Sequence, residues 1–126
     1  VDDDIITTGF VSEEDKYNAI AGASALILPS EHESLSISVL EAMALGIPVL
    51  VNGKSAVLTA HCEKSGAGCT YQTCDEFVQK LDALMRDDAY RRDMGKNGKR
   101  YVDEYYSWQT ILTQVCSLID GRNELR

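Results

Sequence analysis

The sequence is poor in proline, in basic residues and in long hydrophobic runs. Its 126 residues include only 2 prolines and 9 glycines, which excludes collagen-like chains and proline-rich or glycine-rich disordered segments. The 12 basic residues are outnumbered by 20 acidic ones, and the formal net charge of -8 has the wrong sign for binding nucleic acid or an anionic membrane surface. The longest apolar-leaning stretch, residues 35–51, contains Glu41 and Pro48 and is shorter than the roughly 20 residues that span a membrane. We therefore expect no nucleic-acid partner and no transmembrane segment.

The four cysteines form no C-x-x-C pair, and their spacing fits neither a zinc ribbon nor a zinc finger. Asp and His residues do not cluster with metal-ligand spacing either, so we expect no metal site. Such cysteine usage is typical of a reduced, cytoplasmic setting. A disulfide between Cys62 and Cys69 in an oxidising compartment is an alternative that the sequence leaves open.

Short β-like runs alternate with helical patterns along the chain, which is typical of βαβ units. With 44% hydrophobic residues, the chain is large enough for one core and is expected to form a single domain over residues 1–126. Right-handed crossovers then predict an α/β fold, a partial doubly wound parallel sheet of the Rossmann-like kind with about four strands flanked by helices. Strands are expected at 5–8, 25–28, 48–51 and 67–71, and helices at about 12–22, 35–45, 77–85 behind an Asp75 cap, 89–105 and 108–119, with a helical turn within 55–61.

Ligands of such sheets bind outside the carboxyl ends of the strands. Here those ends lead into residues 9–12, 30–36 and 52–55. The outer side of the first strand, Ile5 to Thr8, would have no neighbour. We therefore also expect possible self-association through an exposed sheet edge.

The most informative stretch reads PSEHESLSISVLEAMALGIPVL and runs from Pro29 to Leu50. It contains two carboxylates, Glu33 and Glu41, with seven residues between them. A helix starting near Leu35 would place Glu33 at its entrance and Glu41 about 12 Å further along the axis, at about 1.5 Å per residue. That separation is close to the span of a nucleoside diphosphate sugar.

Between these carboxylates, the helix would begin with free backbone N–H groups at Ser34, Leu35 and Ser36. Such groups lie at the positive end of the helix dipole and can hold an anionic diphosphate. A carboxylate suits a vicinal diol because it accepts two hydrogen bonds at once. The pattern therefore predicts a place for each part of a nucleotide-activated sugar.

The same stretch resembles the signature of the group 1 retaining glycosyltransferases of GT-B fold, in which two carboxylates precede an E-A-M-A-x-G-x-P-V run. The resemblance implies a hexosyltransferase-type enzyme that uses a UDP- or GDP-type nucleotide sugar, retains the anomeric configuration and needs no cofactor or metal. It implies that Glu33, the catalytic candidate, binds donor sugar hydroxyls, that Ser34, Leu35 and Ser36 contact sugar and diphosphate, that Glu41 binds the ribose and that Val11 meets the nucleobase.

Simpler interpretations stand beside these roles. Glu41 can be a solvated helix carboxylate, and Glu33 a helix-start residue favoured by the dipole. Val11 can be a hydrophobic staple onto the following helix. Lys54 can approach a phosphate or remain solvated, and Trp108 after Ser107 resembles the opening of the family's last helix but can simply pack.

The chain departs from the family pattern at two places. Ser34-Leu35-Ser36 replaces the frequent Gly-Phe-Gly, so sugar specificity does not carry over. Residues 52–57 replace the frequent Gly-Gly-x-x-Glu loop. In the family, an N-terminal acceptor lobe and the Arg and Lys that neutralise the diphosphate lie upstream. We therefore expect part of the donor lobe of a larger, cytoplasmic enzyme of polysaccharide biosynthesis, peripheral at the membrane if its acceptor is there, and no turnover by these residues alone.

Two other function classes compete with this interpretation. A receiver-like signalling module is also a small acidic α/β domain, but it needs an Asp at the carboxyl end of a strand, and none follows Leu28 or Val51. A non-catalytic interaction domain with the transferase fold is the other, because a fold does not determine a function. Binding of a nucleotide sugar separates this class from the enzyme.

Overall fold

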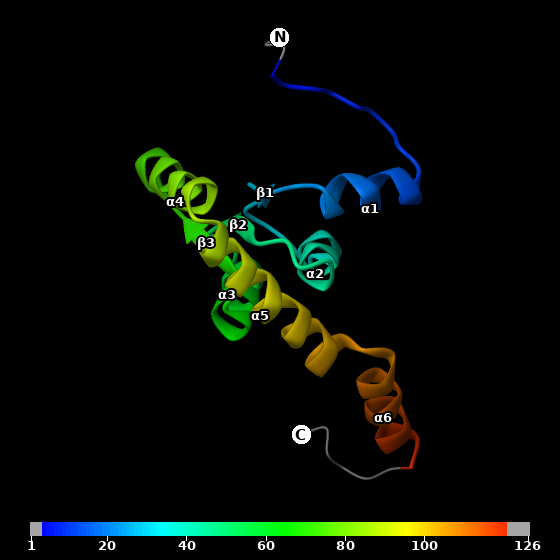
Figure 1. Ribbon diagram of the computed structural model, residues 1–126. Helices are drawn as coiled ribbons and strands as arrows, with labels where there is room; N and C mark the ends of the chain where they lie inside the picture. Colours follow the sequence, from blue (N-terminus) through cyan, green and yellow to red (C-terminus); the bar gives the residue numbers. More distant parts are fainter. Residues whose placement is uncertain (1–3, 121–126) are drawn as a thin grey trace.

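The computed structural model describes residues 4–120, which form a three-stranded sheet surrounded by six helices (Figure 1). The order of elements alternates as the sequence predicts. In chain order they are α1 (Glu13–Ala21), β1 (Leu26–Leu28), α2 (Ile37–Ala44), β2 (Val49–Asn52), α3 (Ala56–Ser65), β3 (Gly68–Tyr71), α4 (Cys74–Arg86), α5 (Asp88–Tyr106) and α6 (Trp108–Ile119).

The three strands run parallel in the order β1-β2-β3. Val49 of β2 pairs with Leu26 of β1 and with Gly68 of β3, which sets the register on both sides. Parallel neighbours need a crossover, and α2 and α3 supply the two crossovers. The predicted α/β class, a parallel sheet flanked by helices, is confirmed.

The strand predicted at Ile5 to Thr8 is wrong. These residues carry no regular structure, with Ile5 64% and Ile6 83% exposed, and Figure 1 shows the segment leading away from the sheet. β-branched side chains favour an extended backbone, but a strand forms only when a neighbour pairs with it. Among residues 4–120 the sheet therefore has three strands, and β1 carries the open edge on that side. Self-association through this edge remains a prediction.

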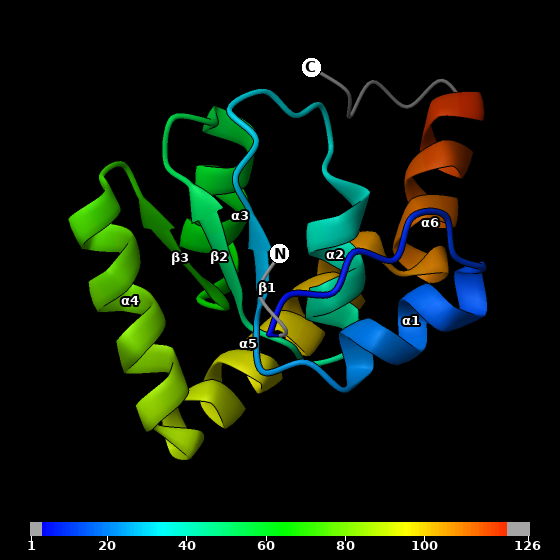
Figure 2. The ribbon, with the colours of Figure 1, turned by 90° about the horizontal axis from the view of Figure 1, so that it is seen from above.

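The two faces of the sheet are covered by different helices, because successive strand residues point to opposite sides. Val49 and Val51 belong to a core cluster with side chains from α2, α3 and α5. Leu50 faces the other way and packs with Leu84 of α4 and Met94 of α5. Figure 2 shows α4 on one side of the sheet and α2 and α3 on the other.

Two glycines bring α5 against α2. A Cβ atom on Gly95 would lie 2.3 Å from the Gly46 carbonyl oxygen, and one on Gly98 would lie 3.1 Å from the Met43 Cα. The backbone of α5 therefore touches the end of α2 directly. Helix α5 continues without interruption across both positions, so the two glycines permit this close approach without breaking the helix.

Side-chain caps explain where most of the helices begin. Ser12, Ser55, Thr73, Asp87 and Ser107 each accept a hydrogen bond from a first-turn N–H, and α2 is the one described helix without such a cap. The predicted Asp75 cap of α4 is wrong, because Thr73 Oγ1 accepts the bond from the Glu76 N–H at 3.1 Å.

Within residues 4–120, no helix is both long and apolar enough to cross a membrane.

Candidate functional site

The loops after β1 and β2 lie at the same end of the sheet, as Figure 2 shows. Asn52 ties them together, because its Nδ2 donates to the Pro29 carbonyl at 3.0 Å and its Oδ1 accepts from the Lys54 N–H at 2.9 Å. Lys54 Nζ lies 3.6 Å from a Glu31 carboxylate oxygen, and both side chains are more than half exposed. Two of the three segments predicted for the ligand edge, residues 30–36 and 52–55, are thus connected. The third, residues 9–12, follows no strand, because residues 5–8 form none.

Helix α2 begins two residues later than predicted. Ser36 is its N-cap and its carbonyl accepts the first helical hydrogen bond, from the Leu40 N–H at 3.3 Å. The first-turn N–H groups therefore belong to Ile37, Ser38 and Val39, and their assignment to Ser34, Leu35 and Ser36 is wrong. The backbone turns at Ser36, where φ is 64° and ψ is 70°, and this left-handed conformation delays the helix.

Ser36 is unusual in its side chain as well. It is 6% exposed, and its Oγ is buried with no hydrogen-bond partner, the single such side-chain oxygen or nitrogen among the described residues. A non-glycine residue in the left-handed region and a buried polar atom without a partner each cost free energy. The position is therefore strained, and it lies directly at the mouth of α2.

We expect Ser36→Gly to raise the free energy of unfolding by about 1 kcal/mol, because glycine adopts positive φ freely and removes the buried hydroxyl. Urea unfolding followed by circular dichroism measures this change. Ser38→Gly is the matched control, since Ser38 lies within α2 and is exposed. It should instead lower stability by about 1 kcal/mol. Equal losses in both variants would show that Ser36 is not strained.

Glu33 lies in the loop, three residues before the N-cap, and is half-buried. It is not at the helix entrance, so the separation of about 12 Å calculated for a continuous helix does not apply. The carboxylate still belongs to the loop that precedes α2. Its predicted role toward a sugar remains untested by the geometry.

Glu41 lies in the second turn of α2 and is held by helix α1. Its carboxylate is 11% exposed and accepts from Lys16 Nζ at 3.2 Å, while Lys16 also pairs with Glu13 at 3.0 Å. The hydrogen bond with Glu13, followed by that with Glu41, raises the pKa of Lys16. Glu41 is thus a paired and largely buried carboxylate, and the alternative of a simple solvated one is wrong.

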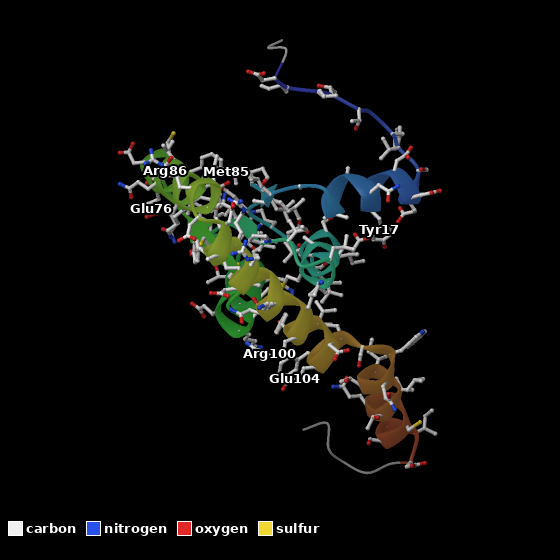
Figure 3. The ribbon with its side chains drawn as sticks, in the orientation of Figure 1. Tyr17, Glu76, Met85, Arg86, Arg100 and Glu104 are labelled. Atoms are coloured by element: carbon white, nitrogen blue, oxygen red, sulfur yellow. The ribbon has the colours of Figure 1, made fainter. Side chains whose placement is uncertain are left out.

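Tyr17 is the second α1 residue at Glu41. A hydrogen bond to Glu41 and the nearby negative charge raise the pKa of Tyr17, so its hydroxyl stays protonated. Figure 3 shows Tyr17 on the side of α1 that faces α2. Lys16 and Tyr17 carry no sequence signal for this site, because their nearness to Glu41 follows from the packing of α1 on α2.

Val11 precedes the Ser12 cap of α1 and is 47% exposed. A hydrophobic staple would pair it with the fourth helical residue, but that residue is Lys16. The staple alternative therefore has no apolar partner here. Val11 leaves an apolar side chain at the surface beside the start of α1.

His61 is a further residue near the motif that no sequence pattern predicts. It lies on α3, is 5% exposed, and reaches the loop before α2 through a 2.8 Å contact between its Nε2 and the Leu35 carbonyl oxygen. On its other side, Nδ1 lies 2.8 Å from the Tyr101 hydroxyl of α5. An isolated histidine in an apolar helical pattern carries no sequence signal for such a bridge.

Two hollows on the described part of the surface lie away from the two glutamates. One of about 540 Å³ lies along α5. Another, of about 490 Å³, is lined by three tyrosines of α5 together with Lys64 and Gln114. Neither hollow is lined by Glu33 or Glu41.

The four cysteines are free, and burial raises the pKa of Cys62 to about 12, so this thiol remains protonated.

Comparison with curated proteins finds relatives over most of the chain. Glycosyltransferase 1 domain-containing protein 1 of Xenopus tropicalis is 33% identical over 102 residues, which cover 79% of this chain and 28% of the relative. MMP alpha-(1->4)-mannosyltransferase of Mycolicibacterium hassiacum is 26% identical over 122 residues, which cover 95% of this chain and 30% of the relative. Sulfoquinovosyl transferase SQD2 of Arabidopsis thaliana is 28% identical over 114 residues, which cover 87% of this chain and 22% of the relative. The chain thus spans less than a third of the length of these relatives.

No solved structure gives a significant match to the chain. The family described as Glycosyl transferases group 1 matches residues 1–101, which include α1 to α4, all three strands and most of α5. The matched region contains Glu33, Glu41 and the loops at the carboxyl edge of the sheet. The chain belongs to the group 1 glycosyl transferases.

Proposed function

We propose that this chain forms part of the donor-binding lobe of a glycosyltransferase and binds a nucleoside diphosphate sugar at the carboxyl edge of its sheet. The observation that carries the proposal is the order of three features there. Glu33 lies in the loop before α2, the uncapped start of α2 follows it, and Glu41 lies one turn further along the helix.

The start of α2 is the proposed site of the diphosphate. The N–H groups of Ile37, Ser38 and Val39 have no partner within the helix, and no side chain caps them. The other described helices have their starts closed by a serine, threonine or aspartate cap. An anion at this position would accept from those N–H groups and would be stabilised by the helix dipole.

Glu41 is the proposed partner of the ribose. Its carboxylate already accepts from Lys16, and carboxylate oxygens have further lone pairs for the two hydroxyls of a vicinal diol. Lys16 and Tyr17 hold the carboxylate in place from α1. Val11, which leads into the same helix and is exposed, is the proposed contact of the nucleobase.

Glu33 is the proposed contact of the donor sugar, where it accepts hydrogen bonds from hydroxyl groups and makes no covalent bond. The motif around it supports transfer with retained anomeric configuration, without a cofactor or metal. Relatives named as a mannosyltransferase and a sulfoquinovosyl transferase support a hexose-type sugar. The site for the acceptor belongs to the rest of the proposed enzyme. We place this enzyme in the cytoplasm.

A saturation-transfer NMR screen against UDP, GDP and their common sugar conjugates tests the proposal. We expect selective signal from one nucleotide and its conjugates, and about 10- to 100-fold weaker binding after Glu41→Ala, because charge-assisted hydrogen bonds are lost. Glu104→Ala is the control, since Glu104 is an exposed residue of α5 (Figure 3). The same loss in both variants, or full binding by Glu41→Ala, would contradict the assignment of Glu41.

A further inference from the structure

The bridge made by His61 joins three parts of the fold. His61 comes from α3, Leu35 from the loop before α2, and Tyr101 from α5. The Leu35 carbonyl oxygen can only accept, so His61 Nε2 must carry the hydrogen and donate it. In the neutral ring, Nδ1 is then an acceptor, and the Tyr101 hydroxyl donates to it. The orientation of the ring is thus determined from both sides.

Tyr101 is suited to this role. It is 5% exposed, and its ring lies edge-on to His61, with 5.9 Å between the ring centroids. Burial, followed by a hydrogen bond with Tyr106, raises the pKa of Tyr101 well above its usual value. The hydroxyl therefore keeps its proton and remains a donor to His61.

The bond to Leu35 also orients the next peptide N–H. The chain contains no cis peptide among its described residues, so the Leu35 carbonyl and the Ser36 N–H belong to one planar trans unit and point in opposite directions. Because His61 holds the carbonyl, the Ser36 N–H points away from His61. Ser36 is the N-cap of α2, so this N–H lies beside the free N–H groups of the first turn.

We infer that His61, held by Tyr101, is a positioning residue that aims the Ser36 N–H and the uncapped start of α2 at the donor diphosphate. The inference rests on the proposed function. Asn52 anchors the beginning of the same loop at Pro29, and His61 anchors its end at Leu35. The exposed residues between these anchors include Glu31 and His32, while Glu33 is half-buried. Of the two anchors, His61 is the one that holds the residue directly before the N-cap Ser36, so it governs the geometry of the helix start.

The test compares two replacements of His61 by nucleotide affinity and by amide hydrogen exchange of residues 33–38. His61→Leu keeps a side chain of similar size but removes both hydrogen bonds. We expect nucleotide binding at least about tenfold weaker, together with faster amide exchange of the loop. His61→Gln offers an N–H near the position of Nε2 and should retain affinity within about threefold. Tyr101→Phe should lie between the two.

Leu81→Ala is the matched control. Leu81 packs against the cluster of Leu50, so its truncation should lower stability at a place away from the loop. It should leave both the affinity and the exchange of residues 33–38 unchanged. Unchanged exchange and affinity in His61→Leu would overturn the inference, as would equal losses in His61→Leu and Leu81→Ala. If the unmodified protein binds no nucleotide, the proposed function fails together with the aim at a diphosphate, while the exchange measurement still decides whether His61 holds the loop.

Discussion

Replacing Gly95 by alanine should lower the free energy of unfolding by about 3 kcal/mol or more, enough to unfold much of the protein. The new Cβ atom would lie 2.3 Å from the Gly46 carbonyl oxygen, and backbone cannot rotate away as a flexible side chain can. The N–H groups of Gly46 and Ile47 donate to the Met43 and Ala42 carbonyls, so backbone hydrogen bonds hold the loop between α2 and β2 in place. The helices would have to separate, and the core between them would open.

The sign of this effect is the informative part. In the interior of a solvated helix, glycine to alanine usually stabilises by about 0.5–1 kcal/mol. Lys96→Ala is the matched control, since Lys96 is the exposed neighbour of Gly95 in α5, and it should change stability by less than about 0.5 kcal/mol. Thermal and urea unfolding measure both variants. A Gly95→Ala protein as stable as the unmodified one would show that α5 does not approach Gly46 so closely.

The second large effect concerns what Glu33 recognises. We expect Glu33→Ala to lower affinity for a nucleotide sugar by about 10- to 100-fold, because one charge-assisted pair of hydrogen bonds to the sugar is lost. Affinity for the corresponding nucleoside diphosphate, which lacks the sugar, should stay within about threefold. Glu41→Ala should weaken both ligands alike, since both contain the ribose.

Calorimetric titrations of each variant with the diphosphate and with its sugar conjugate separate these outcomes. Glu31→Ala is the matched control, because Glu31 lies in the same loop and pairs with Lys54 at the surface. It should affect neither ligand strongly. A parallel loss of both ligands in Glu33→Ala would instead place Glu33 at the diphosphate or ribose.

The strained turn at Ser36 connects the motif with the structure. The family often has Gly-Phe-Gly after its first glutamate, and the third of these positions is Ser36 here. A glycine adopts the left-handed conformation without cost, whereas serine does not. The left-handed turn before α2 is therefore present here, although serine stands where the family pattern often has glycine.

Local patterns in the sequence were sufficient for most of the elements. The strands Leu26–Leu28 and Val49–Asn52 are rich in Leu, Ile and Val, and α6 occupies the predicted range behind a Ser107 cap. These signals depend on residues within a few positions of one another. The stretch from Pro29 to Leu50 likewise resembles the signature of the family that the comparison shows.

The alternation of strands and helices, the α/β class and the two carboxylates of the motif can therefore be predicted from local sequence patterns. Other features depend on packing. Residues 5–8 lack a strand partner, and α2 starts after a left-handed Ser36. Lys16, Tyr17 and His61 lie around the motif. These features could not be predicted because the residues in contact are far apart along the chain. Leu35 and His61 are 26 residues apart and His61 and Tyr101 are 40 apart, so these contacts exist only once the helices have packed on the sheet.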